Sequence, residues 1–136
     1  MDPMEAYSHI NQIIEQVNAV LGTFIIKECG NKERGRTKSE DLTDEKIEEL
    51  ENKFYFSTSK KNIIFGSALD NWGFAVETFG NLLAKKLGED PEKVNKYMWG
   101  DYYYHPKKKQ FLEEPKNEND RPLCVDFILK PIWDIF

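Results

Sequence analysis

The chain has 136 residues, which is enough for one domain of about 100–150 residues, and its net charge is −5. This charge argues against the sequence-independent phosphate binding of a strongly basic protein, and we expect no DNA partner. No apolar run approaches the roughly 20 residues of a membrane span, and no signal-peptide core opens the chain. Cys29 and Cys124 form no C-x-x-C pair, and His9 and His105 stand apart from them. We therefore expect reduced thiols, no metal site, no membrane partner and a cytoplasmic location.

The first part of the chain predicts one helix followed by a charged segment. Asp2 is suited to an N-cap and Pro3 to the first helical position, and Gly22 should end the helix. Between them, apolar residues recur at helical spacing: Ile10, Ile13, Ile14, Val17, Val20 and Leu21. Residues 27–53 are mostly polar or charged and should form a mobile loop. A short helix from Thr43 is the alternative for its end.

The middle of the chain predicts a strand and two helices. Residues 63–65 should form a short buried strand, because an apolar run is bounded by polar residues and by glycine. Helical spacing over residues 72–87 predicts a helix that Gly88 ends. Asp90 followed by Pro91 predicts a further short helix, which should end near Trp99 and Gly100.

The last part predicts a hairpin and a terminal helical segment. Residues 102–104 and 110–112 should pair, residues 113–120 should form a polar loop, and residues 122–136 should be helical with a bend near Pro131. The expected class is α/β. Apolar residues crowd the last positions, so we expect a piece of a longer protein that is marginally stable or self-associates through Trp133, Ile135 and Phe136.

Residues 30–37 read G-x-x-x-x-G-R-T and are one residue away from a phosphate-binding P-loop. A P-loop needs a lysine at the phosphates and a helix whose N-terminus faces them. Here Arg36 replaces that lysine, and the residues that follow lack an apolar face on which a helix could pack. We interpret this motif as a coincidence within a charged segment.

Gly66, Ser67 and Ala68 follow the predicted strand of residues 63–65. Small residues at such a position let backbone N–H groups approach the edge of a flat ligand. Taken alone, the three residues equally fit a tight turn from a strand to a helix, with Ser67 as the cap.

Several blocks of the sequence, in chain order, resemble the elongation factor two family of GTPases. Residues 64–74 resemble the segment that holds the fifth guanine-nucleotide motif, and residues 98–103 resemble the W-G-D-aromatic signature of the inserted subdomain. Residues 127–133 resemble the I-L-x-P-I stretch that follows. The first helix resembles the one after the N-K-x-D motif. The long charged insertion of about residues 27–56 resembles the elongation-factor-like branch that acts in large-subunit maturation.

This resemblance implies a fold and a division into parts. Residues 1–70 would be the C-terminal part of a P-loop-type GTP-binding domain, with the mobile insertion at residues 27–56. Residues 71–136 would belong to an inserted α+β subdomain with a small hairpin. Gly66, Ser67, Ala68 and Leu69 would line the guanine base, with the backbone N–H groups of Ser67 and Ala68 near its carbonyl oxygen. Leu69 stands where other GTPases often keep a lysine.

The resemblance also implies a function for the longer protein. It would bind GTP or GDP with Mg²⁺ on the large ribosomal subunit and act with the Shwachman–Bodian–Diamond protein to release the anti-association initiation factor. The alternatives are a fragment of elongation factor two acting in translocation, and a ribosome-binding module without a nucleotide role. The 136 residues contain no P-loop lysine and no N-K-x-D, and their D-x-x-G pattern, Asp70–Gly73, lies within the block that resembles the fifth motif. We therefore expect no catalytic residue and no GTP hydrolysis by this chain alone.

Two further features each leave two interpretations open. Lys107, Lys108 and Lys109, beside the tyrosines of the predicted hairpin, suit an RNA-contacting patch or a solvated hairpin tip. The three tryptophans suit interface anchors or a core; they are Trp72, Trp99 and Trp133.

Overall fold

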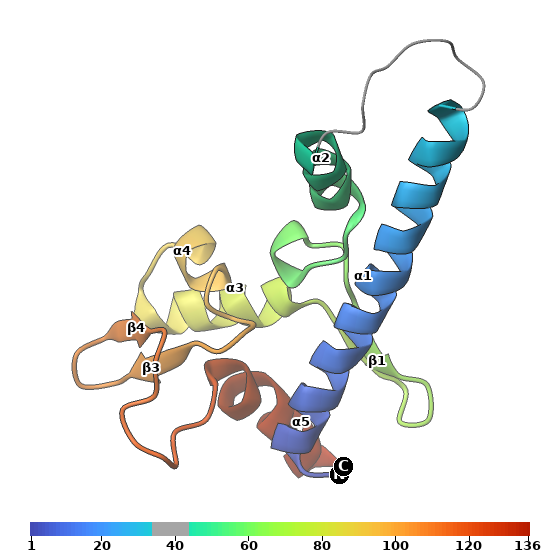
Figure 1. The fold of residues 1–136 in the computed structure, drawn as a ribbon. Coiled ribbons are helices and arrows are strands. Elements are labelled where there is room, and N and C mark those ends of the chain that lie inside the picture. Colours follow the sequence, from blue (N-terminus) through green and yellow to red (C-terminus); the bar gives the residue numbers. More distant parts are fainter. Residues whose placement is uncertain (34–43) are drawn as a thin grey trace. The chain divides into compact units, whose positions relative to one another are not determined.

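The computed structural model describes residues 1–33 and 44–136, with the side chains of residues 29–33 left aside. It divides into two compact units. Unit 1 comprises Met1–His9 and Ser57–Phe136, and unit 2 comprises Ile10–Phe56. Helices combine with two small antiparallel sheets, which confirms the α/β class at this level (Figure 1). None of the described helices is long and apolar enough to cross a membrane.

Helix α1 (Pro3–Glu33) begins where its capping residues predict. The Asp2 carboxylate accepts a hydrogen bond from the Met4 N–H, at 3.1 Å, and the Asp2 N–H donates to the Glu5 carboxylate, at 3.2 Å. This reciprocal arrangement satisfies N–H groups that the first helical turn leaves without a partner. The predicted end at Gly22 is wrong, because the helix continues for three further turns.

Helix α2 (Asp44–Phe54) occupies the last part of the segment predicted as a loop. Acidic residues in its first turn and Lys53 in its last turn match the helix dipole. The alternative of a helix starting near Thr43 is therefore confirmed, and the loop prediction is wrong for residues 27–33 and 44–53. Residues 34–43 lie outside the described residues, as does the second half of the P-loop-like run, whose first four residues belong to α1.

Within unit 2, α1 and the segment after α2 are joined by the side chain of Asn18. Its amide donates to the Phe56 carbonyl at 2.9 Å and accepts from the Phe56 N–H at 2.8 Å. Gly22 allows a close approach nearby, since a Cβ there would lie 2.7 Å from the Tyr55 hydroxyl oxygen. Gly22 thus serves packing, and the prediction that it ends the helix fails for this reason.

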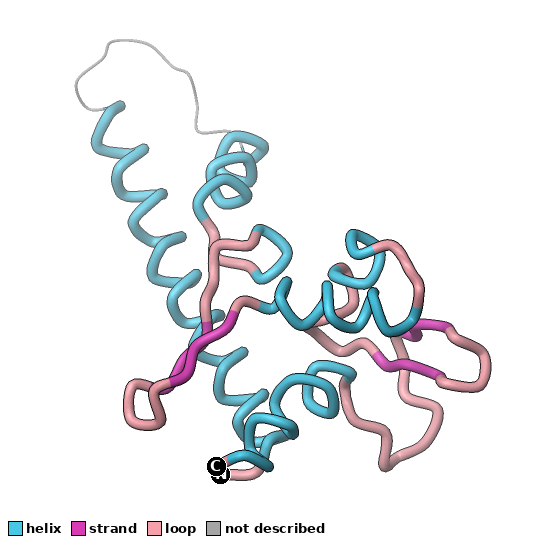
Figure 2. The backbone as a smooth tube through the Cα atoms, turned by 180° about the vertical axis from the view of Figure 1, so that it is seen from behind, coloured by secondary structure: helices cyan, strands magenta, loops and turns pink. Residues whose placement is uncertain are grey.

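The second part of unit 1, from Ser57, opens with a 3-10 turn (Thr58–Lys60). A hairpin of strands β1 (Phe65–Ser67) and β2 (Trp72–Phe74) follows (Figure 2). The strands are antiparallel, with Phe65 opposite Phe74 and Ser67 opposite Trp72. The predicted buried strand at residues 63–65 is therefore displaced by two residues, and Ile64 is 78% exposed. The predicted helix over residues 72–87 loses its first residues to β2.

Two helices and a second hairpin follow. Helix α3 (Val76–Leu87) ends at Gly88, whose φ of 67° is the left-handed cap that the sequence predicts. Helix α4 (Pro91–Asn95) starts at Asp90, whose carboxylate accepts from the Glu92 N–H. It ends before the predicted Trp99. Strands β3 (Tyr103–His105) and β4 (Gln110–Leu112) pair antiparallel and confirm the predicted hairpin, one residue later at its start.

The end of the chain is helical, as predicted, and it contains a wider turn. A π-helix (Val125–Leu129) leads into helix α5 (Lys130–Ile135), and the Lys130 N–H donates to the Val125 carbonyl five residues earlier. Pro131 has no N–H to offer the regular α pattern, which explains the irregularity at the predicted bend. Figure 1 shows the two chain ends beside each other, where the Trp133 indole N–H donates to the Met1 carbonyl at 2.6 Å.

The core of unit 1 lies among α4, the segment before β3 and the C-terminal helical residues. Its most completely buried side chains are Met98, Ile128, Leu129, Val94, Val125, Pro122 and Cys124. Trp99 is buried among aromatic rings, which favours the core interpretation for this tryptophan. Trp72 and Trp133 are half-buried, with ring centroids 6.4 Å apart.

Candidate functional site

The residues predicted to line a guanine base lie at the end of β1 and in the turn after it. Gly66 and Ser67 are paired with β2, whereas Ala68 and Leu69 are exposed in the turn. The turn therefore joins two strands, and the alternative of a strand-to-helix turn is wrong. The structure brings the four residues together on one short hairpin.

Hydrogen bonds inside the turn hold its shape. The Ser67 hydroxyl donates to the Asp70 carboxylate at 2.9 Å and accepts from the Asp70 N–H at 3.2 Å. Asn71, with a φ of 57°, takes the left-handed position that lets the chain return into β2. The Ser67 side chain is thus engaged within the turn, so any contact it makes with a ligand would come from its backbone.

The tip of the turn is open. Leu69 is 91% exposed, and Ala68 carries no side chain beyond Cβ to shield its backbone. Small residues beside an exposed backbone fit the flat edge of a base, which can receive an N–H hydrogen bond. The carboxylate of this turn, that of Asp70, accepts a hydrogen bond from the Ser67 hydroxyl and is not part of an N-K-x-D motif, whose aspartate pairs with the guanine base. The turn can therefore supply only part of a nucleotide site.

A chain of aromatic contacts connects this hairpin to the W-G-D-Y segment. The Phe65 ring stacks on Trp99 with centroids 4.6 Å apart, and Trp99 also packs on Tyr7 of α1 at 5.4 Å. The Tyr7 hydroxyl donates to the Asp101 carboxylate at 3.0 Å. These four residues come from three blocks of the family resemblance, because Trp99 and Asp101 share one block, and the fold packs the four side chains together in unit 1. Sequence reasoning missed the pairing of Tyr7 with Asp101, which has no local spacing signal.

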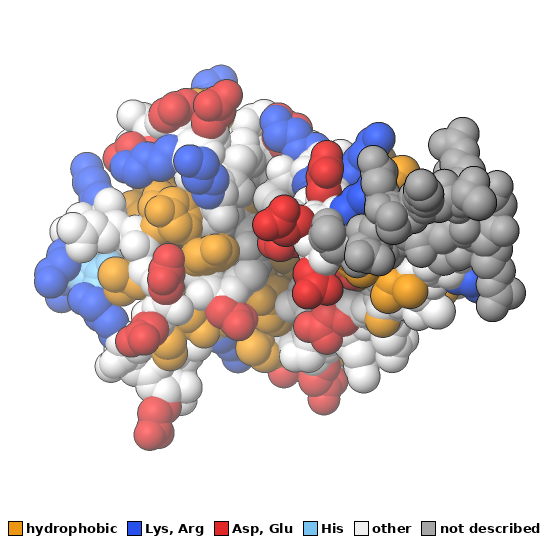
Figure 3. Space-filling view, turned by 45° about the horizontal axis from the view of Figure 1, so that its top comes forward, with side chains coloured by type: hydrophobic (Ala, Val, Ile, Leu, Met, Phe, Trp, Pro, Cys, Tyr) orange, Lys and Arg blue, Asp and Glu red, His pale blue; other side chains and the backbone are white. Residues whose placement is uncertain are grey.

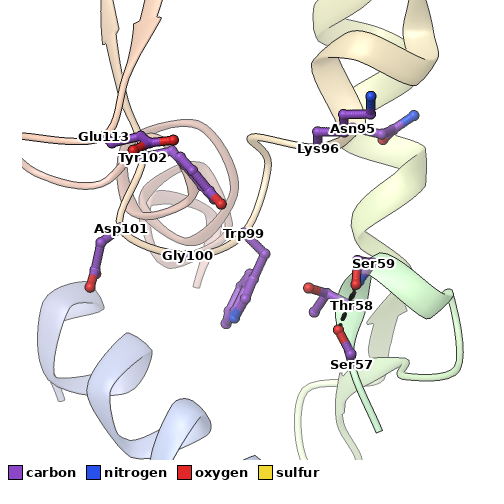
Figure 4. A pocket seen from close by; sticks show the side chains of 10 residues that line it. All are labelled: Ser57, Thr58, Ser59, Asn95, Lys96, Trp99, Gly100, Asp101, Tyr102 and Glu113. Carbon is purple, nitrogen blue, oxygen red and sulfur yellow. Dashed lines mark hydrogen bonds between the residues drawn. The ribbon is translucent and has the colours of Figure 1, made fainter. Parts of the chain in front are cut away.

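A polar hollow of about 510 Å³ lies over the same segment (Figure 4). The figure shows the Trp99 ring on one side, with Ser57, Thr58 and Ser59 opposite it. The Ser57 and Ser59 hydroxyls are 2.7 Å apart and bond each other. Gly100 has a φ of 114°, a conformation that favours glycine, and brings the chain round between Trp99 and Asp101. The hollow is lined by hydroxyl groups and by charged groups of both signs, and this set of residues indicates no particular reaction.

Cys124 offers no reactive group to this region. Its thiol is fully buried near the Gly100 carbonyl, with the sulfur and oxygen 3.9 Å apart. Burial raises the pKa of Cys124 from 9.0 to about 12, so the thiol stays protonated at neutral pH. Within the described part of the chain, no group of three metal-ligating side chains is found.

These blocks, in this order along the chain, are the ones that resemble the elongation factor two family of GTPases, and comparison with known proteins supports that resemblance. The chain is 33% identical to Elongation factor-like GTPase 1 of Homo sapiens, over 98% of its own length. It is 36% and 35% identical to Ribosome assembly protein 1 of Schizosaccharomyces pombe and of Saccharomyces cerevisiae, over its full length. The chain is thus a homologue of one segment of these proteins, and the resemblance found in the sequence is confirmed.

The homologous segment is a small share of each relative. The chain spans about 13% of the length of the curated relatives it matches. No protein-family model matches it. The activity of the relatives therefore belongs to proteins far longer than these 136 residues.

Proposed function

We propose that the chain acts as one segment of a ribosome-associated GTPase in cytoplasmic maturation of the large ribosomal subunit. One observation carries the proposal: relatives named as an elongation-factor-like GTPase and as a ribosome assembly protein match it over at least 98% of its length. The names favour assembly of the ribosome over translocation, the role of elongation factor two. Gly66–Leu69 of this chain would serve the nucleotide, and other parts of the longer protein would serve the phosphates.

For the nucleotide, we propose that Gly66, Ser67, Ala68 and Leu69 line the guanine base of GTP or GDP. The support is geometric, because Ala68 and Leu69 are exposed at the tip of the turn and Ser67 is held by Asp70. Bound GTP with Mg²⁺ would supply the phosphoryl group that is hydrolysed. The residues of this chain would bind and orient the base through backbone N–H groups.

For the partners, we propose the large ribosomal subunit, the Shwachman–Bodian–Diamond protein and the anti-association initiation factor. The names of the fungal relatives support ribosome association. The two protein partners rest on the family resemblance alone. We further propose the boundary near residue 70 between a GTP-binding part and an inserted subdomain.

A chimera tests the proposal. The matched segment of Ribosome assembly protein 1 from Saccharomyces cerevisiae is replaced by this chain, and GDP affinity, GTP hydrolysis and growth are measured. We expect the chimera to bind GDP and to support growth. Ala68→Pro removes one backbone N–H and should weaken GDP binding roughly 10-fold to 100-fold. Ile64→Ala, at a neighbouring exposed position, is the control and should leave GDP binding unchanged.

The chain alone gives the complementary result. Because it lacks the lysine-bearing P-loop, we expect no GTP hydrolysis and a Kd for GDP of about 1 mM or weaker, which corresponds to about −4 kcal/mol. Calorimetric titration measures this affinity. Micromolar binding by the chain alone, or a chimera that does not bind GDP, would contradict the assignment of the turn as one part of a larger site.

A further inference from the structure

The β3–β4 hairpin ends in three consecutive lysines that the nucleotide proposal does not use. Lys107, Lys108 and Lys109 lie in the four-residue connection between His105 and Gln110, and all three side chains are exposed. The Lys108 N–H donates to the His105 ring nitrogen Nδ1 at 3.2 Å, and Lys109 has a φ of 49°. The connection is therefore a defined turn, which we call the lysine tip.

Aromatic side chains stiffen the hairpin behind the lysine tip. The Phe111 ring stacks on Tyr97 with centroids 4.7 Å apart and an interplanar angle of 5°, and it also contacts Tyr104 at 5.2 Å. The Tyr97 and Tyr102 rings form a T-shaped pair with centroids 5.2 Å apart. An isolated hairpin of three-residue strands is marginally stable in water, so these contacts are what hold the tip in place.

Among the described residues, the charge of the lysine tip has no internal partner. In residues 1–33 and 44–136, no ion pair or hydrogen bond of these three ammonium groups is found. Figure 3 shows basic side chains gathered at the left edge of the molecule, where this hairpin lies. The gathering stands out because the chain as a whole is acidic, with a net charge of −5. Lysines are almost never fully buried without partners, so the tip would also stay on the surface of a longer protein.

The surroundings of the tip favour phosphates over an acidic protein segment. A protein segment would need a groove for its side chains, and the hollow lined by residues of β3 itself holds only about 150 Å³. That hollow also mixes acidic Asp120 and Asp126 with basic Lys116 and Arg121. Lysine ammonium groups act as point charges that suit a repeating phosphate backbone and need no fitted pocket. Half-buried Tyr104 and His105 at the end of β3 offer rings beside the phosphate contacts.

We propose that the lysine tip binds the phosphate backbone of RNA, through Lys107, Lys108 and Lys109. The inference rests on the proposed ribosome association for the choice of RNA, and it deepens that proposal by naming the surface that makes the contact. It does not depend on the guanine role of Gly66–Leu69. Contacts of this kind fix the position of a protein on RNA and carry no sequence preference.

The test compares two variants of the 136-residue chain with equal net charge. In the tip variant, Lys107, Lys108 and Lys109 become Gln; in the control variant, Lys85, Lys86 and Lys130, which are exposed elsewhere in unit 1, become Gln. Each replaces three lysines, so the net charge falls from −5 to −8 in both. Binding of fluorescent poly(U) RNA is measured across a series of KCl concentrations. Thermal melts check that both variants remain folded.

We expect the tip variant to bind RNA roughly 10-fold to 100-fold more weakly at low salt, and to lower the slope of log K against log[salt] by about 2. The control variant should lose less than about threefold, as expected from net charge alone. Equal losses in the two variants, or no RNA binding by the unmodified chain, would overturn the proposal. The proposal would also fail if the tip variant lost more affinity for poly-glutamate than for RNA, because this result would identify an acidic protein partner.

A further comparison separates this inference from the proposed function. In the chimera, the tip variant should weaken RNA binding while leaving GDP affinity unchanged. A chimera that fails to bind GDP would contradict the nucleotide role of Gly66–Leu69, but it would not affect the test of RNA binding by the lysine tip. Loss of GDP affinity in the tip variant would instead mean that the lysines act on the nucleotide site, which contradicts an RNA-contacting role.

Discussion

Gly66 and Gly73 face each other across the β1–β2 hairpin, and their surroundings differ. A Cβ on Gly66 would lie 3.0 Å from the Trp72 carbonyl oxygen and 3.5 Å from the Gly73 Cα, both backbone atoms. A Cβ on Gly73 would meet its nearest neighbour, the Phe65 carbonyl oxygen, at 3.5 Å, an ordinary contact. Only Gly66 is thus required by the close approach of two strands.

We therefore expect the same substitution to change the free energy of unfolding much more at Gly66 than at Gly73. Gly66→Ala should lower the free energy of unfolding by about 1–3 kcal/mol, because backbone atoms must shift to admit the methyl group. Gly73→Ala should change it by less than about 0.5 kcal/mol, since alanine fits and also restricts the unfolded chain. Urea unfolding followed by tryptophan fluorescence measures both. Equal effects would mean that the hairpin relaxes freely at either strand.

At the scale of elements, three capping residues predicted boundaries correctly, whereas Gly22 and the apolar spacing at Trp72 did not. The starts of α1 and α4 and the end of α3 follow from Asp2, Asp90 and Gly88, because each acts through its own neighbouring backbone. Apolar spacing failed at Trp72, whose strand pairing depends on Phe65 and its neighbours rather than on residues i+3 and i+4. Pairing partners between strands are set by the fold, so local pattern cannot supply them.

Helix α1 also shows that local pattern does not identify which side chains make contacts with other parts of the chain. Asn18 is not among the apolar residues whose spacing predicts the packed face, yet its side chain holds Phe56 through two hydrogen bonds. Ile13, Val17 and Val20, which the spacing assigns to a covered face, remain 45%, 42% and 57% exposed. For the candidate site, Gly66–Leu69 is a prediction from the sequence, whereas the hairpin that carries these residues and the contact of Phe65 with Trp99 needed the structure.

The Asn18 contact yields a prediction for α2. Asn18→Ala removes a donor and an acceptor and leaves the Phe56 N–H and carbonyl to water, which should cost about 1–2 kcal/mol of unit 2 stability. Asn18→Asp should have an intermediate effect, because the carboxylate still accepts from the N–H but cannot donate to the carbonyl. Amide hydrogen exchange over residues 44–54 measures the loss. Gln16→Ala, at an exposed position of α1, is the matched control, and an equal response there would contradict a specific role for Asn18.

At the scale of the whole molecule, the two units differ in how much they bury. Unit 1 has a core of fully buried side chains, among them Met98, Ile128 and Leu129, and each such side chain contributes about 1.5–3 kcal/mol. Among the residues of unit 2 whose burial is described, Gly22 alone is buried, and it has no side chain to contribute. Since burial of apolar surface is the main stabilising term, unit 2 should open at a lower free energy than unit 1.

The buried thiol of Cys124 reports the opening of unit 1. Because burial raises its pKa to about 12 from 9.0, the folded state keeps the thiol proton at pH 8, where reactive thiolate is roughly a thousandfold scarcer than for an exposed cysteine. The same shift lowers stability as the pH rises from 9.0 toward 12, since only the unfolded chain then loses the proton. In a Cys29→Ser background, labelling of Cys124 at pH 8 therefore requires unit 1 to open.

Two variants should then separate the units. Tyr7→Phe removes the hydrogen bond to Asp101 inside unit 1 and should speed Cys124 labelling by roughly tenfold, leaving exchange of the α2 amides unchanged. Asn18→Ala should do the reverse, because its contacts lie within unit 2. Labelling measured by mass spectrometry and exchange measured on the same samples give both rates. If each variant moved both rates equally, the chain would open as one cooperative body, and the separation into a stable unit 1 and a weaker unit 2 would be wrong.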